Sequence, residues 1–209
     1  MKERAGGEAL FSCCYLAPVE YYAALAKADK IWMEACEHYT KQSYRNRCRI
    51  VSANGVIDLS IPVKQPGGNK TPIRDVRISE HDGWQAKHWR AIESAYNSSP
   101  FFEYYRDDFQ PFYEKKWNFL WDFNWDIQEK MLELLDMNPL IHLTDKYRAS
   151  YGNELKDYRE TIHPKLESKS SFVPYYQVFQ SKFGFIPDMS IVDLLFNMGN
   201  EAVLIVTKQ

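Results

Sequence analysis

The sequence lacks the short motifs that mark the commonest catalytic and nucleotide-binding sites. It contains no Walker A loop, no dinucleotide-binding glycine fingerprint, no nucleophile elbow and no His-Glu-x-x-His zinc motif. The five histidines are scattered along the chain and show no spacing typical of metal ligands. No activity can therefore be assigned from a motif, and the sequence predicts no metal site.

Cysteine is also scarce, with four residues, at positions 13, 14, 36 and 48, in a chain of 209. No pair has the Cys-x-x-Cys spacing of a zinc site, and the adjacent Cys13 and Cys14 do not suit a disulfide framework. All four lie in predicted strands or at their ends, so we expect buried free thiols. Free thiols in turn predict a reducing, cytoplasmic compartment.

Long hydrophobic runs and an excess of charge are absent too. The N-terminal MKERAGGEAL is charged and no continuous apolar stretch follows it, so we expect neither a signal peptide nor a membrane span. The net charge is −2, which argues against a nucleic-acid binder or a general binder of membrane surfaces. Aromatic residues, by contrast, make up 15% of the chain. This content favours a thick aromatic core, or a pocket that stacks on flat or sugar-like faces.

The N-terminal segments predict an α/β fold with a mostly parallel central sheet. Strands near 10–16 and 30–36 flank a helix over 18–28, which is a βαβ unit. In parallel sheets, ligands bind beyond the carboxyl ends of the strands. Those ends fall here at Tyr15–Pro18 and Glu34–Tyr39, and the second runs directly into a basic stretch.

The rest of the chain predicts an antiparallel hairpin and flanking helices. The Asn54-Gly55 pair favours a hairpin over 45–64. We expect a single domain over 1–209, with a polar tail over 1–9 and a charged insertion over 146–171 that can be mobile. Further strands are predicted at 73–78 and 140–145, and helices at 83–97, 111–136 and 189–198.

The stretch HYTKQSYRNRCRI, residues 38–50, concentrates cationic side chains in a slightly acidic chain. A guanidinium binds carboxylate or phosphate through two parallel hydrogen bonds, and a cluster of guanidinium groups is costly unless acidic groups neutralise it. Strand alternation would put Arg45, Arg47 and Arg49 on one face. We therefore predict an anion site, whereas the alternative is a solvated face paired with acids of the chain itself. The predicted anion-binding residues of this stretch are Gln42, Arg45, Asn46, Arg47 and Arg49.

The helix predicted over 83–97 carries a second group of candidates. His88 is the candidate general base, because the pKa of histidine lies near working pH. It lies on the apolar face of the helix, so a core histidine is the alternative interpretation. Lys87 and Arg90 lie on a neighbouring face, where they would either extend the anion site or form an exposed helix surface.

Five ordered segments resemble the WbqC-like family of bacterial proteins, and together they span nearly the whole chain. One position departs from the family pattern: Ala17 stands where the first of two prolines is usual, although Pro18 keeps the helix start. The resemblance implies a link to O-antigen and other surface-polysaccharide genes, and transfer of a small acyl or glycine-like aminoacyl group to a sugar. The segments are YLAPVEYYAALAKAD, HYTKQSYRNRCRI with LSIPVK, IRDVRI, KHWRAIESAYNSSPFFEYYRDDFQPFY and FGFIPDMSIVDLLFNMG.

Three functions follow as expectations. The first is a transferase that acts on a nucleotide-linked sugar or another phosphorylated or acyl-activated metabolite, with Tyr15 and Tyr21 lining the pocket. The second is a nucleotidyltransferase-like protein, although YLAPVEYY has tyrosines in place of the His-x-x-His of those enzymes. The third is a non-catalytic accessory protein of polysaccharide assembly. In each enzymatic case the partner is a small molecule that carries phosphate or carboxylate, and the sequence indicates no particular cofactor or oligomeric state.

Overall fold

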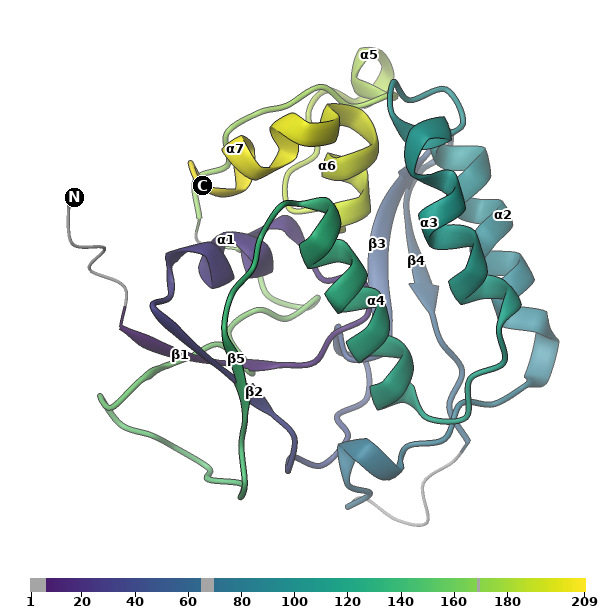
Figure 1. Cartoon of the computed structure of the whole chain (residues 1–209). Helices are drawn as coiled ribbons and strands as arrows, with labels where there is room; N and C mark the ends of the chain where they lie inside the picture. The colour runs from purple at the N-terminus through teal and green to yellow at the C-terminus, as the bar shows by residue number, and fades with distance from the viewer. Residues whose placement is uncertain (1–6, 65–69, 169) are drawn as a thin grey trace.

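The computed structural model describes residues 7–64, 70–168 and 170–209, and it contains two separate sheets. Four parallel strands form one sheet in the order β5-β2-β1-β6, and an antiparallel pair, β3–β4, forms the other. In Figure 1 the parallel sheet lies on the left, and the hairpin stands to its right beside helices α2 and α3. This arrangement confirms the predicted α/β class. The strands are β1 (Glu8–Ser12), β2 (Lys30–Glu34), β3 (Arg47–Ser52), β4 (Gly55–Ser60), β5 (Ile141–Leu143) and β6 (Lys156–Asp157).

The predicted βαβ unit is present, with α1 (Val19–Lys27) joining two neighbouring parallel strands. Strand β1 begins at Glu8 and ends at Ser12, so it lies earlier than the predicted 10–16. The following turn carries Leu16 at φ 40°, a left-handed conformation that a strand cannot contain. The turn therefore delivers Cys13–Pro18 to the carboxyl edge of the sheet.

The two faces of the parallel sheet have different neighbours. On one face, the ring of Phe11 contacts Tyr21 of α1 at 5.1 Å between centroids, and the Tyr21 hydroxyl lies 3.4 Å from Gln128 Oε1 of α4 (Leu120–Leu134). On the other face, Trp32 and Glu34 lie beneath the segment that follows β5. Helices thus pack on the first face, while an irregular segment covers the second.

The hairpin forms at the predicted place, with Gly55 at φ 105° in its turn. Its inner face buries Cys48 and Ile50 completely, and α2 packs against β3. The predicted helix over 83–97 is α2 (Trp84–Tyr96), which is preceded by a single 3-10 turn, η2 (His81–Gly83).

Two predicted elements differ from the structure. Residues 73–78 do not form a strand: they begin with the 3-10 turn η1 (Ile73–Asp75) and then make only isolated β-bridges, because their backbone bonds are divided among Glu37, Lys64 and residues 118–120. The helix predicted over 111–136 begins later, as α4, because residues 111–114 belong to the preceding helix α3 (Phe102–Glu114), which contains Pro111. The helical conformation is interrupted between α3 and α4, where the Trp117 indole donates to the Phe112 carbonyl.

The C-terminal part packs above α1 in Figure 1. Asp193 is buried there and accepts hydrogen bonds from Tyr96, Tyr175 and Gln177. The expected helix over 189–198 begins two residues later, at Ile191. The elements of the C-terminal part are α5 (Gln180–Phe183), α6 (Ile191–Met198), the 3-10 turn η3 (Gly199–Glu201) and α7 (Ala202–Val206).

Two further expectations hold only in part. Cys13, Cys14 and Cys48 are buried free thiols, whereas Cys36 is partly exposed two residues after β2. The strand expected at 140–145 is the short β5, a partly exposed edge strand and not a buried one. Among the described residues, no helix has both the length and the apolar character needed to cross a bilayer.

Candidate functional site

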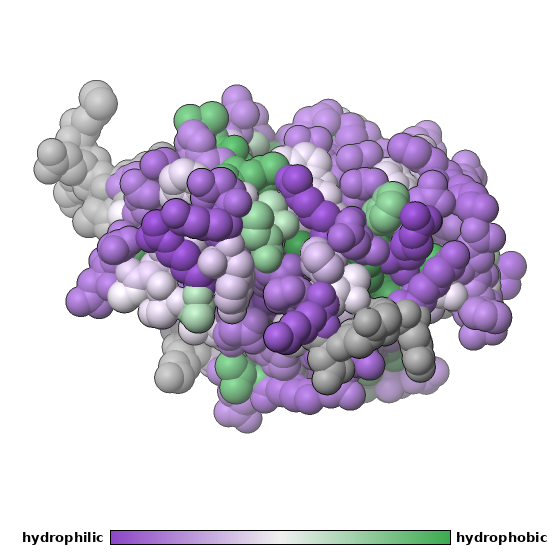
Figure 2. Space-filling model, turned by 90° about the horizontal axis from the view of Figure 1, so that it is seen from below, coloured by the Kyte–Doolittle hydropathy of each residue, from purple (hydrophilic) through white to green (hydrophobic). Residues whose placement is uncertain are grey.

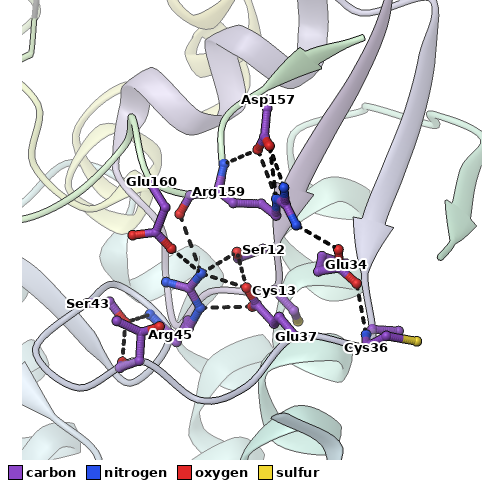
Figure 3. A network of polar contacts seen from close by, with 12 residues as sticks. Ser12, Cys13, Glu34, Cys36, Glu37, Ser43, Arg45, Asp157, Arg159 and Glu160 are labelled. Atoms are coloured by element: carbon purple, nitrogen blue, oxygen red, sulfur yellow. Dashed lines mark hydrogen bonds and ion pairs between the residues drawn. The ribbon is translucent and has the colours of Figure 1, made fainter. Parts of the chain in front are cut away.

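Ionisable side chains gather where the parallel strands end. Ser12 closes β1, Glu34 closes β2 and Asp157 closes β6, so all three project from one edge of the sheet. Figure 3 shows Arg159 between Asp157 and Glu34, and Arg45 beside Ser12, Glu37 and Glu160. Seen from below, the side toward which β2 and β5 run, the molecular surface is mostly hydrophilic, with only scattered hydrophobic residues (Figure 2). We call the cluster of Ser12, Glu34, Glu37, Arg45, Asp157, Arg159 and Glu160 the carboxyl-edge network.

Arg45 is neutralised within the chain. Its side chain is only 3% exposed, and Nε and Nη2 donate to the two carboxylate oxygens of Glu37 at 2.8 and 2.6 Å. The same Nη2 reaches the Ser12 hydroxyl at 2.9 Å and a Glu160 carboxylate oxygen at 3.0 Å. Nε and Nη2 are therefore occupied by partners of the chain itself, and two carboxylates neutralise the buried guanidinium, so Arg45 has little capacity left for an external anion.

Arg159 forms the second half of the network. Its Nη1 donates to Glu34 at 3.0 Å, and Nε donates to both carboxylate oxygens of Asp157. The rings of Tyr147 and Tyr151 lie 5.2 and 5.5 Å from the guanidinium carbon. Sequence analysis did not single out this arginine. Buried ion pairs of this kind cluster at functional sites as well as in structural networks.

Arg47 and Arg49 occupy a different position, on the outer face of β3. Arg47 Nη1 lies 3.1 Å from one carboxylate oxygen of Asp58, and Arg49 Nε lies 3.4 Å from the other. Both side chains are about one-third exposed. Arg45 does not join them, because it precedes β3 and its side chain contacts Ser12 and Glu37 at the carboxyl end of the parallel sheet. The two outer arginines thus share one carboxylate, which leaves a net positive charge.

The other predicted anion-binding residues do not converge on these arginines. Gln42 is exposed at φ 57°, and the Asn46 amide donates to the Ile61 carbonyl at 2.8 Å. Lys87 and Arg90 are exposed on α2. Within the described part of the chain, neither of them has a recorded ion pair.

Tyr15 and Tyr21 are both buried in the core. The Tyr21 hydroxyl donates to the Ser12 carbonyl at 2.9 Å, so it helps to fix the backbone position of Ser12 in the carboxyl-edge network. The Tyr15 hydroxyl lies 3.0 Å from His88 Nδ1 and 2.9 Å from the Tyr113 hydroxyl. Burial lowers the pKa of His88 to about 4, so the imidazole is neutral near pH 7.

The start of α1 is already occupied by a carboxylate of the chain. The Glu20 amide donates to Asp188 Oδ1 at 3.1 Å, and the Val19 amide donates to the Met189 carbonyl. Burial raises the pKa of Asp188 to about 7, against the effect of the Glu20 amide. An anion from solution would have to displace this contact. Across residues 7–64, 70–168 and 170–209, no group of three or more His, Cys, Asp or Glu could hold a metal ion.

Comparison with known proteins places the chain in a family. Uncharacterized protein Rv1507c of Mycobacterium tuberculosis is 26% identical to it over 218 residues, which cover 87% of this chain and 89% of the relative. No solved structure matches. The model of the WbqC-like protein family matches residues 13–167, a span that includes Glu34, Glu37, Arg45 and Arg159 of the carboxyl-edge network. Because this match covers most of the chain, the protein belongs to the WbqC-like protein family.

Proposed function

We propose that this protein is a cytoplasmic transferase of bacterial surface-polysaccharide biosynthesis, of the O-antigen type. Its substrate is a nucleotide-linked sugar or another phosphorylated or acyl-activated metabolite, and the transferred group is an acyl or aminoacyl group such as glycine. Family membership supports the pathway. The observation that carries the proposal is the surplus positive charge of the Arg47–Arg49 pair on the outer face of β3.

The charge count favours this pair as the anion-binding point. Two guanidinium groups face the single carboxylate of Asp58, and all three side chains reach solvent. A phosphate or carboxylate of a substrate would supply the missing negative charge, and guanidinium groups suit such anions geometrically. Arg45 lacks this capacity because Glu37 and Glu160 already neutralise it.

Ligand binding at this pair can be tested by thermal unfolding with nucleotide-sugars, sugar phosphates and acyl-CoA. We expect at least one class to raise the melting temperature, because a ligand at about 100 times its Kd stabilises by roughly 2.7 kcal/mol. The double variant Arg47→Ala/Arg49→Ala should lose this shift. The matched variant Arg74→Ala/Arg77→Ala, which removes two exposed arginines elsewhere, should keep it. A shift that survives in the first variant would contradict the assignment of the anion site.

The catalytic role of His88 stays a prediction, and its burial allows a sharp test. The unfolded chain takes up a proton near pH 6.5, whereas the folded imidazole does so only near pH 4. Stability therefore decreases as pH falls from about 6.5 to 4, by up to roughly 3 kcal/mol from this residue. In His88→Gln we expect a loss of about 1–2 kcal/mol at pH 7 and a weaker decrease toward acid pH, measured by urea unfolding.

The control for this test is His81→Gln, since His81 is exposed and its removal should leave the acid profile unchanged. If His88→Gln loses turnover per folded molecule of the substrate identified above, beyond what its loss of stability explains, His88 acts in the chemistry. If the variant loses stability but keeps its activity per folded molecule, His88 is a core residue.

A non-catalytic accessory role is the second candidate, and one observation favours it. Arg45, Arg47 and Arg49 all have carboxylate partners within the chain, as expected of residues that serve structure or a protein interface. This function predicts no stabilisation by any metabolite of the panel. It also predicts that the double variant of Arg47 and Arg49 folds normally and loses only binding to a partner protein.

A further inference from the structure

A hollow of about 370 Å³ lies on the face of the parallel sheet that carries Trp32. Trp32 projects into it from β2, the central strand next to the edge strand β5. The segment after β5 forms the wall and contributes an aromatic ring together with charged side chains. Its lining includes Glu8, Trp32, Asp145, Lys146, Arg148, Tyr151 and Glu154. The volume lies within the usual range of small-molecule sites, about 300–1,000 Å³.

The indole of Trp32 is held in a fixed orientation. Its Nε1 donates to Glu8 Oε2 at 2.6 Å, and Glu8 in turn pairs with Lys30 at 3.3 Å. The ring of His142 lies beside it, 5.2 Å away between centroids. A fixed, partly exposed indole is a preorganised apolar platform, which lowers the entropy cost of binding a flat apolar face.

The charges around this platform indicate which ligand suits it. Carboxylates come from Glu8, Asp145 and Glu154, and cations come from Lys146 and Arg148. Arg148 lies 3.6 Å from Glu154, so this basic residue is already paired with a carboxylate of the same lining.

An anionic ligand would meet three carboxylates, and a cationic one would meet both basic residues. A cationic ligand would also be repelled by the ammonium of Lys30, which already lies 4.5 Å from the centre of the indole ring. A neutral molecule with many hydroxyl groups uses both kinds of partner, since each hydroxyl donates to a carboxylate and accepts from a cation.

We propose that this hollow binds a neutral saccharide unit, with the C–H face of a pyranose ring stacked on Trp32. Asp145 and Lys146, which have no recorded ion pair within the described residues, would bond to the ring hydroxyls. Tyr151 closes the wall and also contacts Arg159, so the saccharide would lie next to the carboxyl-edge network. The proposal depends on the hollow alone and not on an anion at Arg47 and Arg49.

Saturation-transfer difference NMR on the full chain tests this inference with uncharged probes: glucose, galactose, mannose, N-acetylglucosamine and their methyl glycosides. We expect transfer to ring C–H protons of at least one sugar, with a Kd in the millimolar range or below, about 4 kcal/mol of binding free energy. Asp145→Ala should weaken binding at least fivefold, and Trp32→Phe should weaken it similarly. Arg47→Ala/Arg49→Ala should leave it unchanged.

The controls separate binding from folding. Asp107→Ala removes an exposed carboxylate on α3, and Trp125→Phe alters a partly exposed indole on α4, so both should bind sugar like the wild type. Asp145 is exposed, so its variant is expected to fold even if Trp32→Phe does not. No transfer to any probe at millimolar concentration would overturn the proposal. Equal affinity in wild type and Asp145→Ala would overturn it too, as would binding of choline or inorganic phosphate in the hollow in preference to sugars.

Discussion

Replacing Arg45 with alanine is expected to lower the free energy of unfolding by about 3–5 kcal/mol. The reason is the environment of Glu37, whose side chain is 4% exposed and whose two carboxylate oxygens both accept from the Arg45 guanidinium. Among the described residues, removing the guanidinium leaves the buried carboxylate with the Ser12 hydroxyl as its one remaining side-chain donor. Urea unfolding at neutral pH measures the loss.

Two further variants distinguish an unpaired buried charge from a simple loss of packing. Glu37→Leu/Arg45→Met replaces both partners with apolar groups, and it should cost less than Arg45→Ala alone because no charge is left unpaired. Arg47→Ala breaks an exposed pair with Asp58 and should cost at most about 1 kcal/mol. If Arg45→Ala costs no more than Arg47→Ala, the carboxyl-edge network does not contribute to stability as described.

The second large effect is expected for Gly199→Ala, with a loss of about 2–4 kcal/mol. Gly199 has φ 56°, where a side chain is strained, and a Cβ built there would lie 2.6 Å from the ring of Phe101. The ring or the start of η3 must shift to relieve this overlap. Thermal and urea unfolding of the variant measure the cost.

Matched controls separate the backbone effect from the overlap. Gly152 and Gly184 also have positive φ, but nothing lies within 4 Å of a Cβ at either position. Their alanine variants should cost about 1–3 kcal/mol from backbone strain alone, and less than Gly199→Ala. The double variant Phe101→Ala/Gly199→Ala should recover part of the loss, since Phe101 is 38% exposed and the overlap is gone. Equal losses for all three glycines would show that Phe101 is not involved.

Much of the fold could be predicted from local patterns. Apolar runs of strand length around a helix predicted the βαβ unit, and Asn54-Gly55 predicted the hairpin turn. These patterns succeed because they depend on neighbours in the sequence. The same reasoning placed Pro111 at a helix start, yet α3 runs through it. There the packing of Tyr113 and Phe109 against the core outweighs the cost of the proline.

The candidate site shows the limit of local patterns more clearly. The carboxyl ends of β1 and β2 were predicted as its location, and Glu34, Glu37 and Ser12 lie there. Period-two alternation, however, grouped Arg45 with Arg47 and Arg49. Since β3 begins only at Arg47, the alternation does not extend to Arg45.

The residue composition and the spacing of apolar side chains were enough to specify the class of fold, its first βαβ unit and the edge where charges gather. The ion-pair partners of the charged side chains at this edge could not be predicted from composition or spacing. Arg159 and Glu34 are 125 positions apart and meet only because β6 adds beside β1. Likewise, Trp32 and Tyr151 line the same hollow only because the segment after β5 returns over the sheet. Such contacts depend on how strands pair and loops close, and these long-range events leave no periodic signal in the sequence.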